Sequence, residues 1–346
     1  EGSRMPTHYP NLFLAAARRM AFAALAMLAL AAAPLMAQAK PLTITLLGTG
    51  SPAPNATRFS QSILIEAGSG KYLIDLGRGV TIRLAQLGIP IGKITASFIT
   101  HSHSDHLNGL ADFWMTGWIG TGYGGRTTPM VLYGPKGTEA MAKHLEMAFS
   151  ENTRIRHADE KEPLSGIEID AHDIKGGFSY EHDGIKITAF DTHHGDLIKP
   201  NFGYIIEYDG KKAVISGDTT YDERVAKAAK GADLLLHEVA YITPELMEKK
   251  PIFKAVAAHH TSPEEAGKIF SEARPALAAF THLVIRLSGE QLDLPASNIL
   301  LEQVGKTYDG PVVVGEDLMR FTIGDKAIIV NGDKGQYGFR VGLDKH

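Results

Sequence analysis

Short apolar segments alternate with polar turns along the chain and predict strands and helices in succession. In the first half, period-two patterns between Gly-rich and Pro-rich turns predict strands at 43–47, 62–66, 72–75 and 96–99, with a helix at 79–87. The second half repeats this rhythm with predicted strands at 185–190, 203–208, 213–216, 234–236 and 277–280, and helices at 222–229 and 263–272. This order fits an α/β fold in which two mixed sheets pack together with helices outside.

The segment from Trp114 to Pro129 is rich in Gly, Trp and Thr and follows neither the helix nor the strand period. We therefore predict a loop at the mouth of a binding site. Trp114 and Trp118 suit a substrate-covering role and a place in the core about equally well.

Residues 1–39 have the pattern of an export leader. Arg18 and Arg19 precede an apolar run at 20–33, and a small-x-small cleavage site follows at 37–39. The run is shorter than the roughly 20 residues that span a bilayer, which favours a signal peptide over a membrane anchor. Residues 1–4, ahead of Met5, resemble a cloning remnant. We predict a leader at 1–39, one domain at 40–346 and a periplasmic or secreted protein, by the Sec or the twin-arginine route.

Composition narrows the chemistry. The chain has no cysteine, so any metal must be held by histidine and carboxylate side chains. The formal net charge is -4, and because the leader contributes +2 the rest of the chain stands near -6. An acidic surface disfavours nucleic acid, so we expect a small-molecule ester substrate and no nucleic-acid partner. The oligomeric state stays open.

A dense group of metal-ligand side chains follows the strand predicted at 96–99. It comprises His101, His103, Asp105 and His106. In an extended turn the first two project to one side, while the last two can reach a second ion. Neutral imidazoles and an ionised carboxylate suit zinc, manganese or iron(II). A solvated His-rich loop is the alternative, but a strand that leads into the cluster is the context that a metal site requires.

The pattern His101-x-His103-x-Asp105-His106 resembles the signature of the metallo-β-lactamase superfamily. Other motifs extend the resemblance across nearly all of residues 40–346 and are similar to its ribonuclease Z and arylsulfatase-like branch: LGTGSP at 47–52, IDLG at 74–77, YGP at 133–135, FGY at 202–204, GDT at 217–219 and HE at 237–238. The resemblance implies an αββα sandwich.

The resemblance also implies a binuclear centre, most simply of zinc, with manganese or iron as alternatives. One ion would be held by His101, His103 and His194, and the other by Asp105, His106 and His282, with Asp218 shared. His193 is the alternative to His194, which we prefer because Gly195 follows it. For catalysis, the resemblance implies that Asp105 orients the nucleophile and that His260, in the HTS element at 260–262, protonates the leaving group with Glu238 behind it.

The implied activity is hydrolysis of sulfate or phosphate esters by a metal-bound hydroxide, as in arylsulfatases and phosphodiesterases. Only residues 205–216 separate the FGY and GDT motifs, which leaves no room for the basic arm of members that trim transfer RNA. Similarity of the segment from Trp114 to the arylsulfatase-like members favours an aryl ester. A lactonase or β-lactamase is the main alternative, and transfer-RNA 3′ processing of the ribonuclease Z type and a noncatalytic metal-binding protein rank below it.

Overall fold

The computed structural model describes residue 2 and residues 40–287, 296–333 and 338–343. Residues 40–346 form one compact unit. Apart from Gly2, the predicted leader lies outside the described residues, and export stays a prediction. Within the described part of the chain, no helix has both the length and the apolar character needed to cross a membrane.

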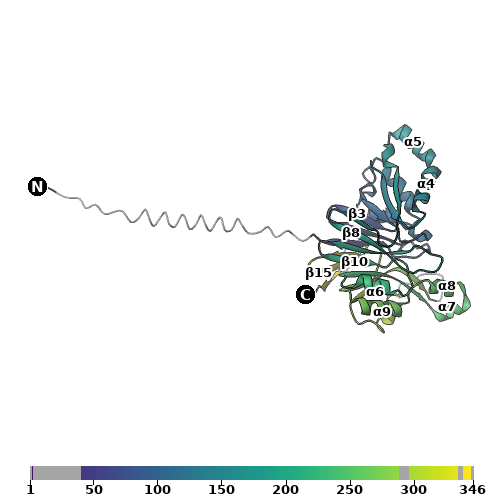
Figure 1. Cartoon of the computed structure of the whole chain (residues 1–346), viewed down its shortest axis with the longest axis vertical. Helices are drawn as coiled ribbons and strands as arrows, with labels where there is room; N and C mark the ends of the chain where they lie inside the picture. Colours follow the sequence, from purple (N-terminus) through teal and green to yellow (C-terminus); the bar gives the residue numbers. More distant parts are fainter. Residues whose placement is uncertain (1, 3–39, 288–295, 334–337, 344–346) are drawn as a thin grey trace. The chain divides into compact units, whose positions relative to one another are not determined.

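Two mixed β-sheets lie at the centre of this unit (Figure 1). In the described residues the first sheet has the order β16 (Gly338–Gly342), β15 (Ala327–Asn331), β14 (Arg320–Ile323), β1 (Leu42–Gly48), β2 (Ser62–Ala67), β3 (Gly70–Ile74), β4 (Ala96–Phe98), β5 (Met130–Gly134) and β6 (Ile169–Asp173). The second has the order β13 (Val312–Val314), β12 (Leu277–Arg286), β11 (Leu234–Ile242), β10 (Lys211–Ile215), β9 (Phe202–Tyr208), β8 (Ile185–Asp191) and β7 (Ser179–His182). Each sheet has a parallel part, β3 to β6 and β10 to β13.

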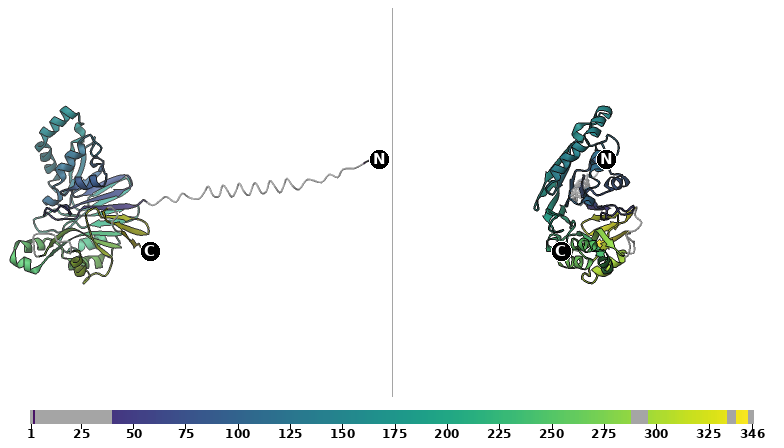
Figure 2. Two further views of the ribbon diagram at one scale, coloured as in Figure 1. Left: turned by 180° about the vertical axis from the view of Figure 1, so that it is seen from behind. Right: turned by 90° about the vertical axis from the view of Figure 1, so that its right-hand side faces the viewer.

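Helices cover the outer faces of both sheets. The first sheet carries α2 (Val80–Gln86) and α3 (Leu110–Trp118), and the second carries α6 (Glu223–Ala229), α9 (Pro263–Ala273) and α10 (Ala296–Val304). In both views of Figure 2, as in Figure 1, α4 (Thr138–Ala148) and α5 (Ser150–Glu160) lie at the opposite end from α7 (Pro244–Lys249) and α8 (Ile252–Ala258). Short 3-10 turns occur at Ile91–Lys93, Ser104–His106 and Leu164–Gly166.

The main core lies between the sheets, where alternate residues of both sheets face each other. Ile44, Ile63 and Phe98 of the first sheet belong to the same fully buried cluster as Tyr204 and Leu236 of the second. Separate apolar clusters lie beneath the helices on each side. This layering of helix, sheet, sheet and helix confirms the predicted αββα sandwich.

The predicted loop from Trp114 is wrong over its first residues. Trp114 and Trp118 belong to α3 and are both 0% exposed. Their indole nitrogens donate hydrogen bonds to the carbonyl oxygens of Ile167, at 2.6 Å, and Pro163, at 2.7 Å. Leu110, Trp114 and Trp118 recur every four residues, which is a helix period, so both tryptophans serve the core and do not cover a substrate.

Candidate metal centre

The histidine cluster lies where β4 ends. His101 follows the strand closely, and a 3-10 turn at Ser104–His106 turns the chain before α3 begins. Asp75 fixes this turn from the neighbouring strand end: its carboxylate accepts hydrogen bonds from the Thr100 backbone N–H, at 2.8 Å, and from the ring of His106, at 2.7 Å. The segment 101–106 is therefore held in place by the buried carboxylate of Asp75, which lies outside that segment.

Asp218 reaches the cluster from the end of β10 in the second sheet. The strand passes into Gly217, whose φ of 63° is in the left-handed region that glycine adopts readily. A Cβ atom at Gly217 would lie 2.3 Å from the carbonyl oxygen of Phe202, so no larger residue fits. This turn aims Asp218 back toward the first sheet.

His282 is positioned by an irregularity within β12. Thr281 pairs with Glu238 and Leu283 pairs with Val239, so His282 is the extra residue of a β-bulge. Its φ is 45°, unusual for a residue with a side chain. Bulges redirect single side chains and are frequent beside active sites. Here the bulge brings the His282 ring to the metal cluster.

The imidazoles converge on one carboxylate oxygen. The Nε2 atoms of four histidines lie within 4.0 Å of Oδ2 of Asp218: His106 and His282 at 3.3 Å, His194 at 3.7 Å and His101 at 4.0 Å. Asp105 Oδ2 lies 3.0 Å from His282 Nε2, and His103 Nδ1 lies 3.2 Å from His194 Nε2. All seven side chains predicted from the sequence are thus brought together. That they bind metal ions stays a prediction.

His193 does not join this group. Its backbone amide donates to Asp222 Oδ2 and its carbonyl oxygen accepts from Thr220, so its place in the structure is set by the backbone. Among the described residues, the groups of possible ligands include His194 and never His193. The preference for His194 therefore agrees with the geometry.

The donor set fits divalent cations. Possible ligand atoms of His101, His103 and His194 lie within 4.8 Å of one another, as do those of Asp105, His106 and His282. Nε2 of His101 is buried and, among the described residues, has no hydrogen-bond partner, which is costly unless a cation binds there. The identity and number of the ions do not follow from the geometry.

The protonation states of several of these side chains also fit metal binding. Burial lowers the pKa of His194 to about 4, and burial together with the neighbouring His106 keeps the pKa of His101 well below its usual range. Burial alone would raise the pKa of Asp218, but the imidazoles of His282 and His106 outweigh burial and hold it well below its usual range. At neutral pH His101 and His194 are neutral imidazoles and Asp218 is an ionised carboxylate, the forms that bind metal. Burial would lower the pKa of His106, but Asp75 and Asp218 outweigh burial and raise it well above its usual range, so a cation that binds His106 must displace a proton.

Hydrogen bonds behind two of the imidazoles fix their tautomers. A carboxylate or carbonyl oxygen only accepts, so Nδ1 of His106 donates to Asp75 and Nδ1 of His194 donates to the His259 carbonyl oxygen, 2.7 Å away. In the neutral form of each ring, Nε2 is then left with its lone pair directed at the cluster. Such partners hold metal-binding histidines in place.

His260 and Glu238 form a hydrogen-bonded pair beside the cluster. Glu238 Oε2 lies 3.1 Å from His260 Nδ1, while Oε1 accepts a hydrogen bond from the Thr261 backbone N–H at 2.8 Å. Burial lowers the pKa of His260, but the charge and hydrogen bond of Glu238 outweigh it and raise the pKa to about 9. The arrangement supplies a protonated imidazole close to His194 and Asp218.

A cleft of about 320 Å³ opens onto these groups. Its floor contains His103, Asp105, His194, Asp218 and His282, together with His260. The remaining walls contain Ser51, Pro52, Phe253, Val256, His259, Val284 and Arg286. Ser51 and Pro52 end the LGTGSP motif at 47–52, whereas Phe253, Val256, Val284 and Arg286 belong to no motif, and the sequence predicts no role for them.

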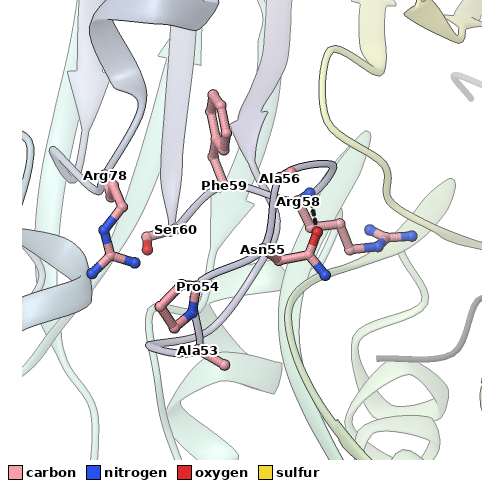
Figure 3. A pocket seen from close by; sticks show the side chains of 8 residues that line it. All are labelled: Ala53, Pro54, Asn55, Ala56, Arg58, Phe59, Ser60 and Arg78. Carbon is pink, nitrogen blue, oxygen red and sulfur yellow. Dashed lines mark hydrogen bonds between the residues drawn. The ribbon is translucent and has the colours of Figure 1, made fainter. Parts of the chain in front are cut away.

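A smaller hollow of about 250 Å³ lies in the loop that follows Pro52 (Figure 3). Asn55 holds this loop by accepting hydrogen bonds from the backbone amides of Thr57 and Arg58. The Arg58 guanidinium donates to Thr49 and to the Gly315 carbonyl oxygen, so it serves the loop structure. Within the described residues no group of possible metal ligands includes a residue of this hollow.

Carboxylates and imidazoles gather at one edge of the αββα sandwich, and a protonated imidazole lies beside them. These are the side chains that a metal-dependent hydrolase uses. The model of the beta-lactamase superfamily domain matches residues 63–283. A protein named Ribonuclease Z from Mycobacterium bovis strain BCG is 32% identical over 284 residues, which cover 82% of this chain and 98% of that protein. Another Ribonuclease Z, from Mycolicibacterium gilvum, is 32% identical over 82% of this chain and 96% of its own length. The chain belongs to the metallo-β-lactamase superfamily.

Solved structures agree in fold. The metallo-beta-lactamase fold protein YhfI from Bacillus subtilis has a TM-score of 0.64 at 18% identity, and the match covers 82% of this chain and all of that one. The short form of human tRNase Z has a TM-score of 0.57 at 22% identity, covering 80% of this chain and 98% of that one. At these identities the likeness establishes the fold alone.

The prediction that this protein has no nucleic-acid partner is wrong. Relatives at 32% identity are named Ribonuclease Z, so net acidic charge does not separate this chain from nucleases. The short segment at 205–216 does not separate this chain from nucleases either. The alignment of 284 residues covers 82% of this chain and 98% of the relative named Ribonuclease Z, so that relative has no long insertion compared with this chain.

Proposed function

We propose that this protein is a metal-dependent hydrolase of phosphodiesters. The observation that carries the proposal is the His260 and Glu238 pair beside the candidate metal centre, in one cleft. A phosphodiester expels an alkoxide, which is a poor leaving group until it receives a proton. The similarity to proteins named Ribonuclease Z supports the same bond type.

Bound divalent cations would lower the pKa of water to about 7 and offset negative charge on the phosphoryl oxygens. Side chains of the protein would donate the proton and orient the water. Glu238 accepts from Nδ1 of His260, so Nε2 carries the hydrogen that is donated to the leaving oxygen. Asp105 lines the same cleft and would accept a hydrogen bond from the attacking water and so orient it.

Charge in the cleft favours an anionic ester over a neutral lactone or lactam. Arg286 lines the cleft, and its guanidinium donates to the Ile285 carbonyl oxygen. Its positive charge would attract a substrate anion. Sulfate esters share this charge, but the aryl-sulfate expectation relied on Trp114 and Trp118, which are buried in the core.

The test is hydrolysis by the purified full chain, loaded with zinc or manganese. The substrates are bis(p-nitrophenyl) phosphate, a short RNA with a 3′ extension, p-nitrophenyl sulfate, an aliphatic lactone and a chromogenic β-lactam. We expect turnover of one or both phosphodiesters, loss with a chelator, and loss in Asp218→Ala but not in the exposed control Asp159→Ala. Turnover of the sulfate, lactone or lactam in preference to both phosphodiesters would overturn the proposal.

A further inference from the structure

We infer that α8 forms a subsite for an aromatic ring on the leaving-group side of the scissile bond; this inference rests on the proposed function. Phe253 and Val256 stand three residues apart on α8 and both line the cleft that contains the metal cluster. Residues with this spacing share one face of a helix. One face of α8 is therefore a wall of the cleft.

The position of α8 in the chain identifies which part of the substrate it meets. The helix ends at Ala258, and His260 is the second residue after it, with its backbone amide donating to the Ala257 carbonyl oxygen at 3.3 Å. His260 delivers the proton to the leaving oxygen, so the space between His260 and the face of α8 receives the leaving group. The His259 carbonyl oxygen accepts from Nδ1 of His194 at 2.7 Å, which ties this wall to the metal centre.

The composition of the wall identifies the chemistry of that group. Phe253 and Val256 are half-buried, and α8 contributes no fully buried residue to the core. Pro52 adds exposed apolar surface to the same cleft, and Val284 on β12, which is only 4% exposed, lines it as well. Apolar surface that is left unburied by the fold gains free energy when a ligand covers it, and a phenyl ring pairs favourably with another flat ring. An aryl ester and a nucleobase both supply such a ring.

Binding of two phosphonates to the zinc-loaded full chain isolates the ring. Phenylphosphonate and methylphosphonate present the same anion, are not hydrolysed, and differ in the ring alone. In isothermal titration we expect the wild type to bind phenylphosphonate about tenfold more tightly than methylphosphonate. Phe253→Ala should bring this ratio of affinities close to one, and Val256→Ala should reduce it. Phe253→Tyr, which keeps an aromatic ring, should retain the wild-type ratio.

Ile252→Ala is the matched control, because Ile252 is on the same helix, is 65% exposed and does not line the cleft. Its ratio should equal that of the wild type. Equal affinity of the wild type for both phosphonates would overturn the inference, as would a ratio that survives both Phe253→Ala and Val256→Ala. Because neither ligand is cleaved, these outcomes are independent of failure to hydrolyse phosphodiesters.

Kinetics then separate the two sources of the ring. If the natural ring is a nucleobase, Phe253→Ala should raise the KM for a dinucleoside monophosphate more than that for bis(p-nitrophenyl) phosphate. If it is a small aryl group, the order should be reversed. A loss in kcat with no change in KM on both substrates would contradict a ring-binding role and indicate that α8 positions His260.

Discussion

The floor and the wall of the cleft are built in different ways. On the floor, Asp105, His194, Asp218 and His282 are each at most 2% exposed, and they come from strands of both sheets or from the turns that follow them. The part of the wall that α8 forms is half-buried, and α8 contributes no fully buried residue to the core. The floor is therefore tied to the stability of the fold, whereas the wall is free to vary. Changes to the floor should affect all substrates alike, and changes to the wall should distinguish between substrates.

His260 belongs to both regions and gives the largest expected effect on rate. It follows the wall helix, yet it serves the chemistry above the floor. His260→Ala should lower turnover of an alkyl phosphodiester by about 10² to 10⁴ and leave the metal content unchanged. A nitrophenolate leaves without a proton, so the loss on bis(p-nitrophenyl) phosphate should be much smaller. Steady-state kinetics and elemental analysis of the same preparations check both statements.

The pH dependence of the alkyl reaction sharpens this prediction. A general acid acts in its protonated form, so the rate should fall as the pH rises through the pKa of His260. Glu238 raises that pKa to about 9, and bound cations would bring it lower because like charges disfavour protonation. His260→Ala should abolish this alkaline decline. Equal losses on both substrate classes would indicate instead that His260 stabilises charge on the phosphoryl group.

The sequence identified the floor far better than the wall, for a physical reason. Four possible ligand side chains within six residues after a strand leave few structural alternatives, and the same strand pattern predicted the two sheets. Phe253 and Val256 carry no such signal, because an apolar pair at helix spacing usually faces a core. The same ambiguity applies to Trp114, for which the sequence predicted a loop and left a substrate-covering role and a core position equally open. Whether an apolar face meets core or ligand depends on tertiary packing.

Replacing Trp114 tests this distinction between a core aromatic residue and a wall aromatic residue. Its side chain is fully buried and its indole donates to Ile167. Trp114→Ala should lower the free energy of unfolding by about 3–5 kcal/mol, as expected for a large core residue. Urea denaturation measures the loss. The folded fraction should keep the wild-type preference for phenylphosphonate, in contrast to Phe253→Ala, which should change the preference with little loss of stability. A changed preference in Trp114→Ala would place that residue in the cleft after all.

Asp75 gives the smallest expected effect and tests how the floor is held. Its backbone has a φ of 62°, which asparagine tolerates, so Asp75→Asn should fold without new strain. One amide oxygen can still accept from Thr100, but the NH₂ group then faces Nδ1 of His106 and cannot accept its hydrogen. The ring is pushed to the tautomer that carries its hydrogen on Nε2, the nitrogen directed at the metal centre. We expect a loss of about 10–100-fold in zinc affinity, measured by competition with a chelating dye, and none in Asp159→Asn. At saturating zinc the substrate preference should be that of the wild type, because the wall is untouched. An unchanged zinc affinity would mean that His106 does not bind the ion through Nε2.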